Sequence, residues 1–346
     1  MTASDRSARV ALGRLAAYLA CLRFRDILAL QGPPLLGAVV ALRELTVDRL
    51  AGLLVLAVAN LLLVAHIFVL NDWAGADDDL NDANKWAEAF ATKGLSRRGI
   101  GRLWLALLAA SLSLFAVLGV RTLLFAAAIA ILSALYSGPR MSAKGRPILG
   151  SALHLGGGVL HFLLGVAPFR EIDGAALAIG LLCGLAFTAG HLTQEARDFE
   201  GDRVNRIATN AVVFGKKRAF IAGFALFTAA YAQLFILAAV GVFPRWLAIL
   251  GGLFAAHAYW SLEALSEGLS FASICRLQAR YRAIFAVIGL AILSTLLVSI
   301  ATKVSSNDGR MLEFGRGYGS LPPPHPLCQK PRELHPCLDR RGPWSA

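Results

Sequence analysis

Two acidic clusters stand out in a chain that otherwise carries little charge. The first runs from Asn71 to Asp82 and the second from Glu195 to Asp202, and together they hold nine of the chain's 22 acidic residues. Each cluster begins where a long apolar run ends. Neighbouring carboxylates repel one another and resist leaving water unless cations hold them together. We therefore expect the clusters to bind a multivalent cation that bridges to a phosphorylated substrate.

Helical spacing places the carboxylates of each cluster on one face. Asp72 and Asp79 are seven residues apart, and Glu195, Asp198 and Asp202 stand at positions i, i+3 and i+7; both patterns follow the turns of a helix. Carboxylate oxygens, water and substrate phosphates are the usual ligands of Mg²⁺. The spacing predicts two stripes, each holding one Mg²⁺, that grip a diphosphate between them. A solvated helix end is the alternative interpretation of either cluster alone.

The elements that carry these clusters are predicted to be membrane helices. Hydrophobic residues make up 57% of the chain and charged residues only 16%, unlike the composition of a soluble domain. Nine apolar stretches are long enough to cross about 30 Å of hydrocarbon as a helix, namely 26–43, 50–70, 103–119, 121–137, 148–168, 174–193, 219–242, 245–262 and 282–302. The sequence therefore predicts an all-α, polytopic membrane bundle of about nine transmembrane helices.

The predicted spans divide the chain into three parts. Residues 1–25 form a cytoplasmic N-terminal segment without the features of a cleavable signal peptide. Residues 26–302 form the membrane domain. Residues 303–346 are predicted to be a disordered tail, because seven of the 13 prolines lie in 305–346 and no helical periodicity is visible there. The five cysteines lack metal-site spacing and suggest no disulfide framework.

The distribution of Lys and Arg predicts the orientation of the bundle. The N-terminal segment and four long loops, near 71–101, 137–147, 194–218 and 263–281, hold 22 basic residues, whereas four short turns hold five. Basic loops stay in the cytoplasm, so we expect both acidic clusters on the cytoplasmic side of the cell (inner) membrane and the tail on the other side. Orientation and anionic membrane lipids account for most of the net charge of +12. No nucleic-acid partner is expected.

The two clusters resemble the paired aspartate motifs of the UbiA-type intramembrane prenyltransferase superfamily, Asn-Asp-x-x-Asp-x-x-x-Asp after the second helix and Asp-x-x-Asp-x-x-x-Asp after the sixth. In the first motif Asn71, Asp72 and Asp79 match. Gly75 stands where the family has its middle aspartate, with Asp77 and Asp78 nearby as substitutes.

In the second motif Asp198 and Asp202 match, and Glu195 replaces the first aspartate with a longer carboxylate. A third match is the segment from Tyr136 to Arg140 with Lys144, which is similar to the family's Tyr-Ser segment and basic loop between helices 4 and 5. The resemblance covers about residues 20–302.

This resemblance implies nine helices around a central cavity and Mg²⁺-assisted transfer of a prenyl group from a prenyl diphosphate to an aromatic or other lipophilic acceptor. It implies that four catalytic aspartates also bind metal together with Glu195: Asp72, Asp79, Asp198 and Asp202. We call these four the site aspartates. The implied substrate-binding residues are Asn71, Tyr136, Arg140, Lys144 and Arg23.

Other classes remain open at this point. A different membrane phospho-group transferase, such as a CDP-alcohol phosphotransferase, would place its aspartates in one extended segment. That segment would show a paired Asp-Gly and Ala-Arg pattern, which is absent from this sequence. A transporter would hold its carboxylates near the midplane of the membrane rather than at helix ends. A non-catalytic lipid-binding scaffold of the same fold fits the loss of one motif carboxylate at Gly75.

Polar residues inside the predicted spans are the remaining candidates. Asn60, His161 and His191 are costly in hydrocarbon unless they face a cavity or a partner on another helix. His191 precedes Glu195 by one turn, from where it could orient a metal ligand. A satisfied hydrogen bond between helices is the alternative for each of them.

Overall fold

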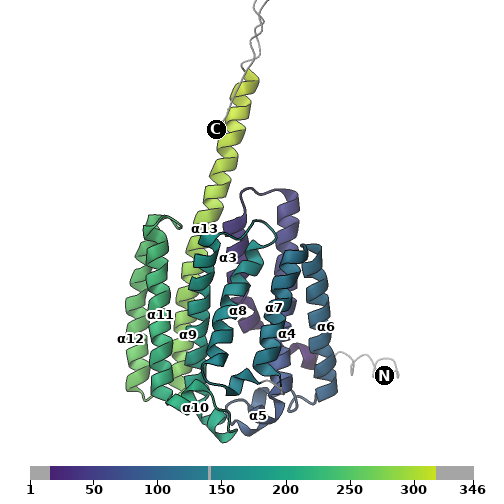
Figure 1. Cartoon of the computed structure of the whole chain (residues 1–346), viewed down its shortest axis with the longest axis vertical. Coiled ribbons are helices and arrows are strands. Elements are labelled where there is room, and N and C mark those ends of the chain that lie inside the picture. The colour runs from purple at the N-terminus through teal and green to yellow at the C-terminus, as the bar shows by residue number, and fades with distance from the viewer. Residues whose placement is uncertain (1–15, 139–141, 317–346) are drawn as a thin grey trace, which may run out of the picture. The chain divides into compact units, whose positions relative to one another are not determined.

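The chain is all helical in the parts that the structure describes. The computed structural model describes residues 16–138 and 142–316, and these residues contain no β-strand. Their helices pack side by side as a bundle (Figure 1). The predicted all-α membrane architecture is confirmed.

Seven of the described helices are long and apolar enough to cross a membrane. They are α4 (Val47–Ala74), α6 (Arg97–Val117), α7 (Val120–Ser137), α8 (Leu149–Val166), α9 (Gly174–Val204), α11 (Lys216–Ala239) and α13 (Phe271–Arg316), whose apolar span is Phe271–Ile300. Each overlaps one of the nine predicted stretches. These helices make the chain an integral membrane protein.

The other two predicted spans are not single long α-helices. Residues 26–43 form α2 (Phe24–Ala29) and α3 (Gly32–Ala41), and residues 245–262 form the 3₁₀-helix η3 (Arg245–Gly252) followed by α12 (Leu253–Ser266). Prolines in the first turn of α3 explain the first break, because proline can begin a helix but cannot continue one from the preceding turn. Hydropathy detects the length of such an apolar stretch but does not detect a break in the helix within it.

Polar side chains from three segments meet at the break between α2 and α3. Asn60 of α4 donates its Nδ2 to Gln31 Oε1 at 2.9 Å, and its Oδ1 lies 2.7 Å from Nε2 of His161 on α8. A buried polar group that is hydrogen-bonded in this way costs far less than an unpaired one. For Asn60 and His161 the structure therefore shows the alternative interpretation, a satisfied hydrogen bond between helices.

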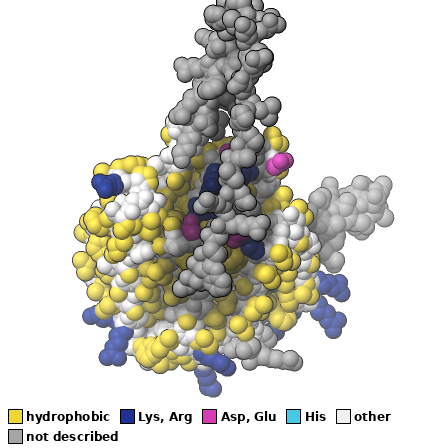
Figure 2. All heavy atoms as spheres, turned by 45° about the horizontal axis from the view of Figure 1, so that its top comes forward, with side chains coloured by type: hydrophobic (Ala, Val, Ile, Leu, Met, Phe, Trp, Pro, Cys, Tyr) yellow, Lys and Arg dark blue, Asp and Glu magenta, His cyan; other side chains and the backbone are white. Residues whose placement is uncertain are grey.

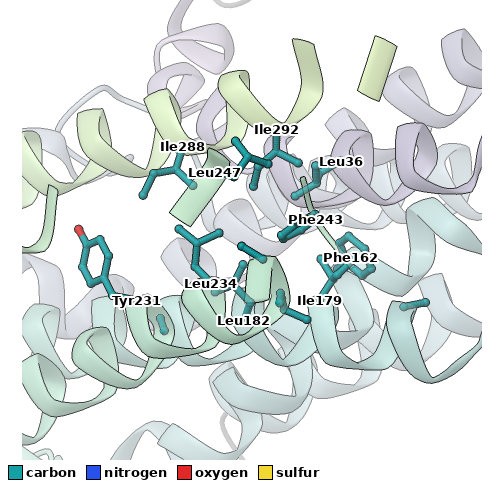
Figure 3. Close-up of a cluster of buried hydrophobic side chains, with 14 of the residues drawn as sticks. Leu36, Phe162, Ile179, Leu182, Tyr231, Leu234, Phe243, Leu247, Ile288 and Ile292 are labelled. Carbon is teal, nitrogen blue, oxygen red and sulfur yellow. The ribbon is translucent and has the colours of Figure 1, made fainter. Parts of the chain in front are cut away.

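A buried hydrophobic cluster joins α3, α8, α9, α11 and α13 (Figure 3). It includes Phe162 of α8, Ile179 of α9, Leu234 of α11 and Ile292 of α13. All four side chains are almost completely buried. This packing fixes α9, which carries the second acidic cluster, against its neighbours, whereas α4 packs in a separate buried cluster that includes Leu56 and Leu63.

Glycines allow α3 and α8 to touch backbone to backbone. A Cβ at Gly165 would overlap the backbone of Pro34, and a Cβ at Gly37 would overlap the backbone oxygen of Phe162. Small residues at helix crossings permit such close approach in membranes, where packing rather than water exclusion drives helix association.

The outer surface of the bundle suits a lipid environment. Figure 2 shows hydrophobic side chains over most of the visible flank and several Lys and Arg side chains at its lower margin. Leu54, Leu124, Ile249 and Val287 are among the large apolar residues that point outward. A flank of this kind, made of helices with internally satisfied backbones, is what hydrocarbon tolerates.

Short helices close one end of the bundle. They are α5 (Ala76–Asn81), η1 (Trp86–Glu88), η2 (Ala143–Gly145) and α10 (Asn210–Phe214). Figure 1 shows α5 and α10 at the same lower end. Both acidic clusters therefore lie at one end of the bundle, as the alternation of long and short connections predicts.

The last helix runs past the predicted boundary of the tail. α13 is helical to Arg316, whereas the sequence predicts a disordered tail from residue 303. Disorder of the tail stays a prediction. The first proline after residue 302 is Pro322, and nothing before it prevents the helix from continuing. The rest of the predicted tail lies outside the described residues.

Candidate active site

The first acidic cluster spans the junction of α4 and α5. Gly75 ends α4 and precedes α5. Hydrogen bonds from Gly75 N to Asn71 O and from Asp79 N to Gly75 O, both 2.9 Å, carry the helical path across the junction. Asp72 lies before the junction and Asp79 after it, so the two site aspartates of the first motif belong to adjoining helices.

Arg23 stands close to both of these carboxylates. Its Nη2 lies 2.5 Å from Asp72 Oδ1. Burial lowers the pKa of Arg23, but the charges of Asp72, Asp79 and Asp26 more than offset this effect, and the pKa of the guanidinium lies above its usual value. A residue predicted to bind substrate therefore contacts a predicted metal ligand.

The second acidic cluster lies in the last turns of α9, and Asp198 is its most strongly paired member. Arg197 holds both carboxylate oxygens, with Nε 2.6 Å from Oδ1 and Nη2 3.0 Å from Oδ2. Lys85, from the loop after α5, places its Nζ 3.0 Å from the same Oδ2. Asp202, one turn further along α9, is buried with 4% of its surface exposed.

The structure brings the two clusters together through α5 and the end of α9. Asn205 donates its Nδ2 to the backbone oxygen of Asp78 at 2.9 Å and accepts a hydrogen bond from Asn81 at 3.2 Å. A Cβ at Gly201 would overlap the carboxylate of Asp82, so α5 and α9 are in direct contact there. A side chain at Gly201 would require the Asp82 carboxylate, rather than the backbone, to move.

Lys144 of η2 also lies near the carboxylates of the site aspartates. Burial raises the pKa of Asp79, and the positive charges of Lys85, Lys144 and Arg23 oppose the rise without cancelling it. We call Arg23, Lys85 and Lys144 the site cations. Three separate segments thus bring positive charge to the carboxylates. Arg140, the other predicted contact in this loop, lies outside the described residues.

Glu195 occupies a different setting from the site aspartates. It is buried, and its Oε1 accepts a hydrogen bond from Nδ2 of Asn210 on α10 at 3.1 Å and lies 3.1 Å from His191 Nε2. Its Oε2 is buried without a hydrogen-bond partner among the described residues. One oxygen of this predicted metal ligand is therefore engaged within the protein. Its metal-binding role stays a prediction.

Aromatic and histidine rings form the layer beneath the site. His191 stacks on His154 of α8 with ring centroids 3.7 Å apart, and Tyr136 meets His154 edge-on at 4.7 Å. Next to Tyr136 on α7, Ser137 donates its Oγ to Asn71 Oδ1 at 3.2 Å. This hydrogen bond links the end of α7, which carries Tyr136, to Asn71 in the first acidic cluster. Asn71 and Tyr136 are both predicted to bind substrate.

Sequence reasoning missed three contributors to this site, Lys85, Arg197 and Asn205, and gave Asp82 no role beyond membership of the first cluster. The one signal for Lys85 and Arg197 is position, because each lies within a few residues of an acidic motif, but many basic residues at membrane surfaces share that property. The partners they choose depend on how α5 docks on α9.

The donor groups present suit Mg²⁺ bound together with a diphosphate. No group of three or more His, Cys, Asp or Glu side chains converges tightly enough among the described residues to hold a metal alone. Mg²⁺ is usually held by one or two carboxylates together with water and substrate phosphates. Each acidic cluster can supply carboxylates in that small number. The site cations supply the charges that phosphate oxygens need.

Comparisons with known proteins agree with this architecture. The model of a family described as the UbiA prenyltransferase family matches residues 32–268. The structure of a digeranylgeranylglyceryl phosphate synthase is similar with a TM-score of 0.62 at 18% identity, covering 82% of this chain and 98% of that one. No curated protein sequence matches the chain significantly.

Two archaeal structures are also similar. A UbiA homologue from Archaeoglobus fulgidus bound to GPP and Mg²⁺ has a TM-score of 0.60 at 20% identity, covering 80% of this chain and 99% of that one. An apo UbiA homologue from Aeropyrum pernix K1 has a TM-score of 0.57 at 16% identity, covering 79% and 99%. At such identities the likeness shows that the fold is shared.

Proposed function

We propose that this chain, which belongs to the UbiA prenyltransferase family, transfers a prenyl group from a prenyl diphosphate to an aromatic or other lipophilic acceptor with the help of Mg²⁺. The observation that carries the proposal is the meeting of two acidic clusters and three site cations at one end of an apolar bundle. The homologue from Archaeoglobus fulgidus, solved with GPP and Mg²⁺, supports a diphosphate donor.

The chemistry follows from the charges. An allylic diphosphate leaves when the negative charge that develops on it is neutralised. Bound Mg²⁺ would be held by the site aspartates and would supply part of that positive charge. Arg23, Lys85 and Lys144 would bind the phosphate oxygens and orient the leaving group, which their positions beside the carboxylates support. Positioning charges in advance lowers the barrier without rearrangement during the reaction.

The apolar bundle suits the step that follows loss of the diphosphate, in which an allylic cation has to be kept from water. A reactive allylic cation would be captured by water if the site were open. The layer beneath the site is formed by His154, His191 and Tyr136, and below it lie apolar helices. An isoprenoid tail is itself lipid-soluble and could enter among such helices from the membrane, whose lipids would surround the enzyme.

Product formation tests the proposal directly. Purified full-length protein in lipid vesicles would be given a panel of prenyl diphosphates and aromatic or lipid acceptors, and products would be identified by mass spectrometry. We expect prenylated acceptor and free diphosphate only when Mg²⁺ is present. Binding of the donor with no product from any acceptor would instead favour the non-catalytic scaffold of the same fold.

The variant Gly75→Asp separates an enzyme from a scaffold. A Cβ at Gly75 would lie 3.3 Å from the backbone oxygen of Asn71, so a small local shift accommodates the side chain. If neighbouring carboxylates already supply the ligand that the family has at this position, the rate of prenyl transfer should stay within a few-fold of wild type or rise. An inactive wild-type chain that gained activity from this change would mean that the natural protein is a scaffold.

Orientation in the membrane is a second testable part of the proposal. We expect Lys217→Cys, at the exposed start of α11, to react with a membrane-impermeant thiol reagent added on the cytoplasmic side only. Glu171→Cys, in the exposed turn between α8 and α9, should react only from the other side, because basic loops stay in the cytoplasm. Both would be made in a background without the native cysteines. Labelling of both from one side would contradict the proposed topology.

A further inference from the structure

Two cations on Asp198 are held in different ways. Arg197 contacts both oxygens of this carboxylate and is itself anchored, since its Nη1 donates to Gln278 Oε1 at 2.9 Å and its guanidinium lies over the ring of Phe271 at 5.8 Å. These contacts tie Arg197 to α13. Arg197 can therefore keep Asp198 oriented whichever other cation binds it.

Lys85 lacks an anchor of this kind. Its Nζ lies 3.0 Å from Asp198 Oδ2 and 3.7 Å from Asp82 Oδ2, and a quarter of its side chain is exposed. A lysine ammonium is a compact charge with three donors on a flexible four-carbon stem. Burial lowers the pKa of Lys85, but the charges of Asp198, Asp202 and Asp79 and the hydrogen bond to Asp198 together outweigh that effect. The pKa lies above its usual value, so Lys85 stays charged.

We propose that Lys85 and Mg²⁺ compete for Asp198, and that Lys85 moves to a phosphate oxygen of the donor when Mg²⁺ takes the carboxylate. This inference rests on the proposed function and adds an exchange step to it. Lys85 would act as a positioning cation that leaves a metal ligand and binds the leaving group.

Electrostatics favours this exchange over shared binding. Arg197 already occupies both oxygens of Asp198, and Lys85 shares Oδ2 with it. Mg²⁺ would be a third cation at this carboxylate, and its repulsion with the unanchored Lys85 disfavours binding of both at once. When the donor is present, Mg²⁺ held at Asp198 would also take phosphate oxygens as ligands. The released ammonium therefore finds a new anionic partner within reach of its stem. The exchange conserves the number of charge-assisted contacts that Lys85 makes.

The loop that carries Lys85 can stay in place during the exchange. Asn205 links α9 to α5 through Asp78 and Asn81, and the contact of Asp82 with Gly201 adds a second tie. None of these contacts uses the Lys85 ammonium. Movement of one side chain is sufficient.

The test uses Lys85→Gln, which removes the charge but keeps much of the stem, and measures two binding events by calorimetry on the purified full chain. Without a competitor at Asp198, Mg²⁺ alone should bind severalfold more tightly than to wild type. Inorganic diphosphate at saturating Mg²⁺ should bind about tenfold more weakly, the size expected for one contact to a charged group. The two affinities should move in opposite directions.

Two further variants control the measurement. Lys85→Arg keeps the charge and should keep both affinities within a few-fold of wild type. Arg98→Gln removes a charge from the exposed start of α6 and should change neither. Thermal unfolding of each variant would accompany the titrations.

Each outcome decides something. If Lys85→Gln weakens both ligands, or changes neither, Lys85 is only a tie between the loop and α9 and the exchange is wrong. Tighter Mg²⁺ binding cannot arise from misfolding, so the expected result is not open to that explanation. If wild type itself bound neither Mg²⁺ nor diphosphate, the proposed function would fail first, and the exchange with it.

Discussion

Asp202→Asn should lower the rate of prenyl transfer by about 10²-fold or more, the usual effect of losing an electrostatic contact to the transition state. Asp79→Asn should behave similarly. Among the described residues, neither carboxylate forms an ion pair within 4.0 Å, so no pairing is lost with the charge. Burial of Asp202, together with the like charges near it, disfavours its ionised form, and the unfolding temperature should stay the same or rise.

The measurement combines prenyl transfer across a Mg²⁺ titration with thermal unfolding of each variant. Asp48→Asn is a matched control, because Asp48 lies in the first turn of α4, at the opposite end of the helix that carries Asp72. Its turnover should match wild type. If the Asp79 and Asp202 variants both kept near-normal turnover and an unchanged Mg²⁺ requirement, the clusters would be solvated helix ends instead.

Asp72→Asn and Asp198→Asn should lose at least as much activity but are harder to interpret. The first frees Arg23 from a contact of 2.5 Å, and the second frees both Arg197 and Lys85. An unpaired cation left in a partly buried position can destabilise the protein by itself. Their unfolding temperatures therefore have to be measured before any loss of rate is attributed to metal binding.

Gly165→Ala should destabilise the membrane domain severely. The added Cβ would overlap the backbone of Pro34 on α3, and a backbone cannot rotate away as a flexible side chain can. Relief requires α3 to separate from α8 along the close crossing that also involves Gly37. Overpacking a core commonly costs about 1–3 kcal/mol, and we expect a value at or above the top of that range.

Gly289→Ala provides the control for this prediction. Gly289 lies in the apolar span of α13, and no other helix among the described residues comes within 4 Å of the position that its Cβ would take. Its replacement should be neutral or slightly stabilising, because alanine favours a helix more than glycine does. Thermal unfolding of the purified protein in detergent would compare the two. Equal unfolding temperatures for both variants would contradict the close contact of α3 with α8.

The sequence by itself predicted the class of fold and the end of the bundle where the acidic clusters meet. The length of an apolar run and the spacing of residues along a helix are local properties, so α4 and α9 and the two carboxylate stripes could be read directly. The sequence did not reveal where a helix breaks within a predicted span. The break at Gln31 is stabilised by Asn60 and a second helix that are distant in the sequence.

Tertiary structure alone decided which charges meet. Lys85 and Asp198 lie 113 residues apart in the chain and come within 3.0 Å because α5 docks on α9 at Gly201. Glu195 continues the stripe of Asp198 and Asp202, yet it binds Asn210 and lies against His191. Helical spacing assigns a residue to a face, whereas its partner is set by whatever packs against that face. Packing depends on contacts between distant segments, and no local pattern records them.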